Sequence, residues 1–108
     1  MYIKCGWAEF VNPTDGAIVA RGSVSARAIP GVGRAYWDGE VRLLRGHEDL
    51  LDISKQLWLL RFEQGLAERW VELSTVERRW APSGLRATAI VRSYDREVPP
   101  VVNELGGE

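Results

Sequence analysis

The chain has 108 residues, of which 45% are hydrophobic and 27% are charged, which is the range of one ordinary globular domain. Lys and Arg number 14 against 15 for Asp and Glu, so the formal net charge of -1 gives no overall attraction to nucleic acid or anionic lipid. Cys5 is the only cysteine, which excludes an intrachain disulfide, a cysteine zinc cluster and a CxxC redox pair.

The first quarter of the chain alternates in the way that β-strands do. Residues 2–11 form the first predicted strand, with Cys5 and Trp7 on the same face, and a turn containing Pro and Gly follows it. Residues 18–28 form the second predicted strand, and one of its faces carries mainly small side chains. We therefore expect another layer to approach this face closely, with Gly22 at a bend or bulge.

The next segment has two interpretations. Residues 29–33 are predicted to form a loop, and its short GxG is too small a fragment to predict phosphate binding. In residues 34–44, Asp38-Gly39 is typical of a tight hairpin turn, whereas alternation continues through these two residues as in one long strand. We favour a single strand bent at Gly39, because each arm of a hairpin would have only about five residues.

A helical pattern occurs in residues 46–56. Glu48 and Asp49 lie in the first turn, where acidic side chains interact favourably with the helix dipole, and Leu50 and Ile53 are three apart. The segment is long enough for two to three turns, which would cover one end of a sheet.

Residues 57–80 are predicted to form the longest hairpin, which carries three of the five tryptophans. A five-residue loop sets Phe62 opposite Trp70, whereas a two-residue loop sets Arg61 opposite Glu68. We favour the five-residue loop, because it pairs aromatic and aliphatic side chains across the strands. Both faces of the first strand are apolar, so we expect a core on one side and a further cover, such as a partner subunit, on the other.

The last predicted strand is residues 85–94, after a Pro- and Gly-containing turn that would bring Trp80 opposite Arg86 in a cation-π pair. The predicted architecture is therefore a mainly β domain over residues 1–95. About six antiparallel strands curl into a barrel or roll, with one short helix. Residues 96–108 contain Pro-Pro and Gly-Gly and are predicted to be a mobile tail.

Few residues are candidates for catalysis. The only histidine, His47, lies where a helix is expected to begin, and we interpret it as a structural residue rather than a metal ligand or a base. A carboxylate acting in acid-base chemistry would have to be buried. The carboxylates considered for this role are Glu9, Asp38, Glu72 and Glu77. No nucleotide, haem, flavin, zinc or calcium motif is present, so we expect neither a cofactor nor a metal.

The tryptophan content points instead to binding. Five tryptophans are many for a domain of this size, and we expect at least one to line a cavity or an interface. The leading hypothesis is a binding protein whose curled sheet encloses a cavity for a small aromatic or amphipathic ligand. The residues predicted to line that cavity are Tyr36, Trp37, Trp58, Arg61, Trp70, Glu72 and Arg78.

Two other functions stay open: a small lyase, isomerase or hydrolase using a buried carboxylate, and a protein-interaction module. Nucleic-acid binding is not expected, given the net charge. The surplus of Trp and Arg and the two apolar faces of the central strand predict a homo-oligomer, most simply a dimer. The lone cysteine, the absence of long apolar runs and the lack of a signal-peptide pattern predict a cytoplasmic protein outside membranes.

Overall fold

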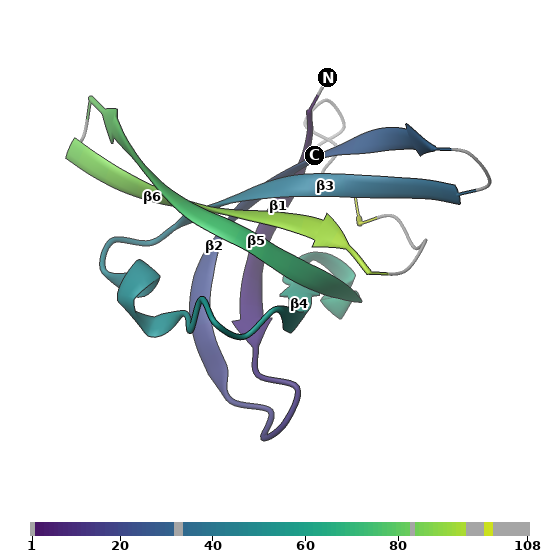
Figure 1. The fold of residues 1–108 in the computed structure, drawn as a ribbon, viewed down its shortest axis with the longest axis horizontal. Helices are drawn as coiled ribbons and strands as arrows, with labels where there is room; N and C mark the ends of the chain where they lie inside the picture. Colours follow the sequence, from purple (N-terminus) through teal and green to yellow (C-terminus); the bar gives the residue numbers. More distant parts are fainter. Residues whose placement is uncertain (1, 32–33, 83, 95–98, 101–108) are drawn as a thin grey trace.

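The computed structural model describes residues 2–31, 34–82, 84–94 and 99–100, and within them six antiparallel strands form one closed barrel (Figure 1). Around the barrel the strands follow the order β1-β2-β3-β6-β5-β4, and β4 pairs with β1 to close the ring. The predicted curled, mainly β architecture is confirmed. The strands are β1 (Ile3–Val11), β2 (Ile18–Gly31), β3 (Arg34–Leu43), β4 (Leu57–Phe62), β5 (Glu68–Ala81) and β6 (Gly84–Ser93), and single 3-10 turns form η1 (His47–Leu50) and η2 (Gln64–Leu66).

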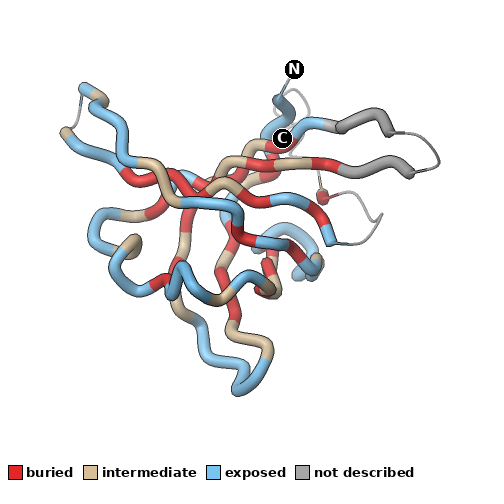
Figure 2. The backbone as a smooth tube through the Cα atoms, viewed as in Figure 1, coloured by how far each residue is buried: buried red, intermediate tan, exposed pale blue. Residues whose placement is uncertain are grey.

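Side chains from all six strands fill the barrel, so that buried and exposed positions alternate along the tube in Figure 2. The largest is Trp58, which packs edge-on against Phe10 with the ring centroids 6.0 Å apart. The small residues expected on one face of β2 do face inward, and Gly22 there lies against the backbone of β3.

A bulge in β1 changes which residues face the core. Cys5 is buried, but the register with β2 shifts between Lys4 and Gly6, and Gly6 has a φ of 82°. After the extra residue the inward positions are Ala8 and Phe10, and Trp7 faces outward. The prediction that Cys5 and Trp7 share a face was wrong, because one bulged residue reverses the alternation that follows it.

The favoured register of the central hairpin was also wrong. Arg61 pairs with Glu68, as the two-residue loop requires, and an ion pair of 2.9 Å joins them. The two registers differ by an odd number of positions, so the five-residue loop would have turned Trp70 and Glu72 inward in place of the buried Val71. Core packing therefore selects the observed register.

The ambiguous segment around Asp38-Gly39 forms one continuous strand, as predicted: Gly39 pairs with Ala26 on β2 and with Val91 on β6. The loop predicted over residues 29–33 is shorter than expected, since β2 continues to Gly31.

The helix expected over residues 46–56 is reduced to the four residues of η1, so the prediction of two to three turns was wrong. Leu51 is already extended, and the Asp52 side chain accepts hydrogen bonds from the backbone nitrogen (3.0 Å) and hydroxyl (2.6 Å) of Ser54. Such local bonds stabilise a turn in competition with a helix.

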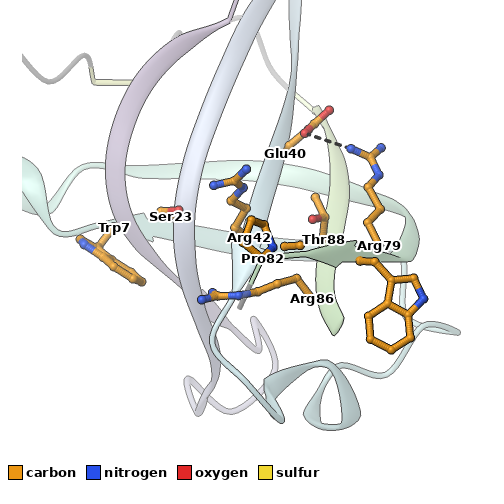
Figure 3. A pocket seen from close by; sticks show the side chains of 10 residues that line it. Trp7, Ser23, Glu40, Arg42, Arg79, Pro82, Arg86 and Thr88 are labelled. Atoms are coloured by element: carbon orange, nitrogen blue, oxygen red, sulfur yellow. Dashed lines mark ion pairs between the residues drawn. The ribbon is translucent and has the colours of Figure 1, made fainter. Parts of the chain in front are cut away.

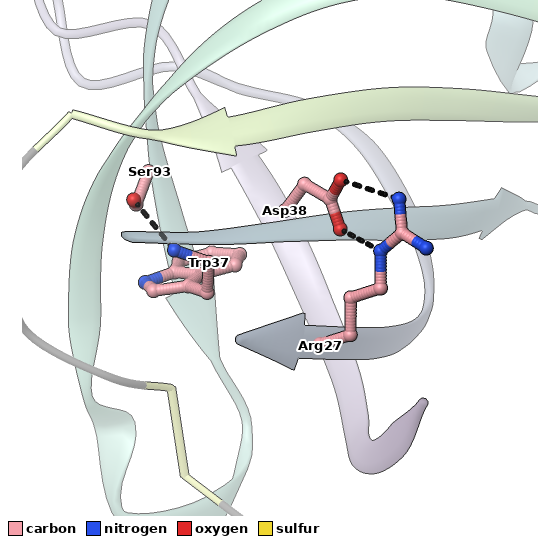
Figure 4. Close-up of polar contacts among 4 residues, drawn as sticks. All are labelled: Arg27, Trp37, Asp38 and Ser93. Carbon is pink, nitrogen blue, oxygen red and sulfur yellow. Dashed lines mark hydrogen bonds and ion pairs between the residues drawn. The ribbon is translucent and has the colours of Figure 1, made fainter. Parts of the chain in front are cut away.

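Side-chain bonds fix β3 to both of its neighbours (Figure 4). The backbone nitrogen of Trp37 donates a 3.0 Å hydrogen bond to the buried hydroxyl of Ser93 on β6. On the outer side, the Arg27 guanidinium donates two hydrogen bonds of 3.1 and 3.2 Å to the carboxylate of Asp38. Charge-assisted bonds in this two-point geometry hold the strands in register.

The β5–β6 hairpin extends beyond the barrel. The last pair between β3 and β6 is Arg42 with Thr88, whereas β5 and β6 remain paired as far as Ala81 with Gly84. The outer part of this hairpin, residues 78–82 and 84–87, is called the β5–β6 ribbon below and is seen at the left of Figure 1.

Of the predicted tail, only Pro99 and Pro100 are among the described residues, and Pro99 is buried. For the rest of residues 96–108, the prediction of a mobile tail lies outside the described part of the structure. In the part of the chain that is described, no helix has the length and apolar character needed to cross a membrane.

Candidate functional site

The seven residues predicted to line a ligand cavity are divided between the core and the outer surface. Trp37 and Trp58 belong to the hydrophobic core, and the indole nitrogen of Trp58 donates a 3.0 Å hydrogen bond to the carbonyl oxygen of Lys55. The backbone of Tyr36 pairs with Ile29, but its side chain lies outside the described part of the structure.

The other four predicted residues lie on the outside of the barrel. Arg61 is engaged by Glu68, Trp70 is 37% exposed, and Glu72 is exposed. Arg78 lies 3.8 Å from Asp49 of η1. These side chains are spread over β4 and β5 and are not gathered into one site with the buried tryptophans.

The carboxylates considered for acid-base chemistry do not meet the requirement of burial. Among Glu9, Asp38, Glu72 and Glu77, none is buried; Asp38 is paired with Arg27, and Glu77 with Arg79. Nδ1 of His47 accepts a 3.0 Å hydrogen bond from the backbone nitrogen of Arg21, which ties η1 to β2. The structural interpretation of His47 agrees with this contact.

A groove on the outer face of the barrel is a candidate site among the described residues. It consists of two adjoining hollows of about 580 and 710 Å³, which share Trp7, Ser23, Glu40 and Arg42. One hollow extends toward Tyr2 at the start of β1. The other, shown in Figure 3, extends across β6 to the β5–β6 ribbon. None of the seven residues predicted from the sequence lines either hollow.

Cross-strand pairing builds the floor of this groove. Trp7 pairs with Ser23, Ser23 with Arg42, and Arg42 with Thr88, so one row of outward side chains crosses four neighbouring strands. At a strand spacing of about 4.8 Å, the row spans roughly 14 Å. Because Ser23 is small, the floor is low between the Trp7 ring and the long side chain of Arg42.

Three arginines, Arg42, Arg79 and Arg86, line the hollow at one end of the groove. In Figure 3 the Arg79 side chain is directed toward Glu40, apart from those of Arg42 and Arg86. Arg79 and Arg86 are directly opposite each other in the β5–β6 ladder, a like-charge pairing that destabilises a sheet unless other charges offset it. Glu77 contacts Arg79, and Glu40 lies 3.9 Å from it. Arg42, by contrast, has no hydrogen bond or ion pair with any of the described residues.

Aromatic side chains lie at the other end. The Arg21 guanidinium lies 4.9 Å from the centre of the Trp7 ring, and Arg27 lies 5.4 Å from that of Tyr2. Partial burial, and then the negative charge of Glu40, raise the pKa of the Tyr2 hydroxyl, so this phenol is neutral at physiological pH. The groove thus has an aromatic wall formed by Tyr2 and Trp7. Its end at β3, β6 and β5 is lined by three arginines together with Glu40 and Trp80.

Sequence reasoning did not find this groove. Alternation with buried Val41 and Leu43 predicts that Arg42 faces outward, but only the pairing of β3 with β6 brings it beside Arg86. Trp7 was expected on the same face as Cys5, because the bulge at Gly6 was not recognised. Comparison with family models, with curated proteins and with solved structures finds no match to this chain.

Proposed function

We propose that the protein binds a small anionic ligand with a flat apolar part in the groove on the outer face of the barrel. The observation that carries this proposal is the row from Trp7 to Arg42, which ends beside Arg79 and Arg86. This keeps the class of function predicted from the sequence, a ligand-binding β-barrel protein, and moves the ligand from an enclosed cavity to the outer surface.

The chemistry of the arginine end favours a carboxylate or phosphate. A guanidinium offers two parallel N–H donors that match the oxygens of these groups. A bound anion would also offset the repulsion between Arg79 and Arg86, which face each other across the ribbon. Arg42 contributes most, since it gives up no existing ion pair with the described residues when it binds an anion.

The aromatic end sets the shape of the ligand. The Trp7 indole is 41% exposed and is held from one side by Arg21, which itself pairs with Glu63. Stacking on a ring that is already ordered costs little conformational entropy. A ligand of nucleotide or aryl-carboxylate size would contact Trp7 and Arg42 together, because two strand spacings, roughly 10 Å, separate them.

Isothermal titration calorimetry with inorganic phosphate, benzoate and AMP tests the proposal. We expect AMP, which carries both a phosphate and a flat ring system, to bind more tightly than phosphate or benzoate. Replacing Arg42 by Gln should weaken AMP binding at least tenfold, since charge-assisted bonds contribute about 1.5–3 kcal/mol each. Trp7→Leu should reduce the affinity for AMP more than that for phosphate.

Arg92→Gln is the matched control, because Arg92 is also an exposed arginine, on β6, but does not line the groove. It should leave the affinity within twofold of the wild-type value. Equal losses in the Arg42 and Arg92 variants would show non-specific attraction to positive charge. The absence of heat with all three compounds at millimolar concentration would also overturn the proposal.

A further inference from the structure

The β5–β6 ribbon exposes apolar side chains on the side opposite to its arginine pair. Trp80 pairs directly with Leu85 across the ribbon, and these residues are 82% and 46% exposed. Side chains alternate between the two faces along a strand, so Trp80 and Leu85 lie on the face opposite to Arg79 and Arg86. Trp80 is thus the most exposed of the large apolar residues in the described part of the chain. Trp80 also borders the hollow that these two arginines line.

The segment containing η1 lies beside this apolar face. Arg78 is two residues from Trp80 and therefore shares its face, and it lies 3.8 Å from the Asp49 carboxylate. Near the end of the ribbon, Nη2 of Arg45 is only 3.4 Å from the position that a Cβ on Gly84 would occupy. Leu50, which follows Asp49, is 55% exposed. The apolar surface thus combines Trp80 and Leu85 with a leucine of η1.

Opposite charges border the two halves of this surface. On the ribbon, Arg78 shares the face of Trp80, and residues 78–86 contain no acidic residue. Residues 46–52, by contrast, contain Glu48, Asp49 and Asp52 and neither Lys nor Arg. A nucleic acid or an anionic membrane would meet the acidic segment next to Trp80, and repulsion would oppose binding. A partner that suits both halves must itself carry a basic part beside an acidic one.

We infer that the partner is a second copy of this chain, bound about a two-fold axis. In such an interface, the ribbon of each protomer faces the η1 segment of the other, so every contact occurs twice. Arg78 of one ribbon meets Glu48 and Asp49 of the partner, and Trp80 packs against the apolar residues beside them. The acidic η1 segment, which repels nucleic acid and anionic membranes, is complemented by the basic ribbon of a second copy.

The ribbon is suited to this role by its shape. It projects beyond the last β3–β6 pair, so it can reach a neighbouring molecule without disturbing the barrel (Figure 1). A standard interface takes about 800 Å² from each partner, and the most strongly contributing residues are typically Trp and Arg at its centre. Trp80 and Arg78 are the residues of those types on this face.

Sedimentation equilibrium of wild-type protein and two tryptophan variants tests the inference. Trp80→Ala should raise the dissociation constant of the dimer at least tenfold, whereas Trp70→Ala, which changes another exposed tryptophan of β5, should leave it within threefold. Circular dichroism should show that both variants remain folded. A wild-type protein of 12.1 kDa at 100 μM, or equal effects of the two substitutions, would overturn the proposal.

A pair of charge reversals tests the two-fold arrangement itself. Arg78→Glu and the double variant Glu48→Arg/Asp49→Arg should each associate weakly alone, because both copies of the charged contact become repulsive. An equimolar mixture should associate as well as wild-type protein, since the altered ribbon then meets the altered η1 segment and the other contact is native. A mixture that associates no better than its components would overturn the arrangement. Arg42→Gln should not affect association, which separates this result from ligand binding in the groove.

Discussion

Gly22 on β2 lies directly against the main chain of Arg42 on β3. A Cβ atom on Gly22 would be 2.8 Å from the carbonyl carbon of Arg42 and 2.8 Å from Cγ1 of Val41, and closer still to the Arg42 carbonyl oxygen. Real Cβ atoms essentially never come so near to other heavy atoms. The close approach of these two strands therefore requires glycine, and it positions the arginine that we assign to the groove.

Replacing Gly22 by Ala should consequently lower the free energy of unfolding by about 1–3 kcal/mol, the usual cost of forcing atoms into a packed interior. Urea denaturation followed by tryptophan fluorescence would measure the loss. Gly39→Ala is the graded comparison, because its nearest contacts are 3.2 Å away and need only a small shift. A cost at Gly22 no larger than that at Gly39 would contradict the steric argument.

The two predicted site tryptophans on the central hairpin should behave differently. Trp58 is 2% exposed and contacts Phe10, so Trp58→Ala should cost about 3–5 kcal/mol of stability. Trp70→Ala should change it by less than about 1 kcal/mol, since the side chain is partly in solvent. Thermal and urea unfolding would separate these outcomes. A nearly neutral Trp58→Ala would instead favour a ligand cavity beside this residue, as the sequence suggested.

Burial raises the pKa of the Cys5 thiol above its ordinary value of 9.0. A raised pKa in the folded state means that the fold favours the protonated form, so this contribution to stability is complete below pH 9 and is lost as the pH rises further. The melting temperature of the wild type should therefore fall between pH 9 and pH 10.5 more than that of Cys5→Ala, which lacks the titrating group. A constant difference between the two proteins over this range would contradict the prediction.

The sequence predicted local features of the fold better than it predicted registers. Alternation and turn residues identified the strands. The continuity of β3 through Asp38-Gly39 followed from the unbroken alternation together with the short arms that a hairpin would have had. The bulge at Gly6 was not visible, because an extra residue leaves no mark in an alternating pattern until the partner strand is known. The hairpin register failed for a related reason: favourable pairs such as Phe62 with Trp70 were counted without asking which face the core required.

The candidate groove was beyond sequence reasoning for a different reason. Its residues come from β1, β2, β3, β5 and β6, and it depends on the pairing of β3 with β6, which are distant in the chain. Trp80 was expected opposite Arg86, but the ladder sets it opposite Leu85 and places Arg79 against Arg86. That shift by one position is what separates an apolar face of the ribbon from an arginine face.

The order of the strands also determines how the ring can assemble. β1 to β3 form one meander and β4 to β6 form another, each built from hairpins between consecutive strands, and only the β1–β4 and β3–β6 pairs join them. Local hairpins form readily, whereas pairing across a long stretch of chain is slow. The two halves are thus expected to form first and to dock as units late in folding. A break in the exposed connection at residues 52–54, which lies between the halves, would leave both meanders whole, so this is the position at which a divided chain should reassemble.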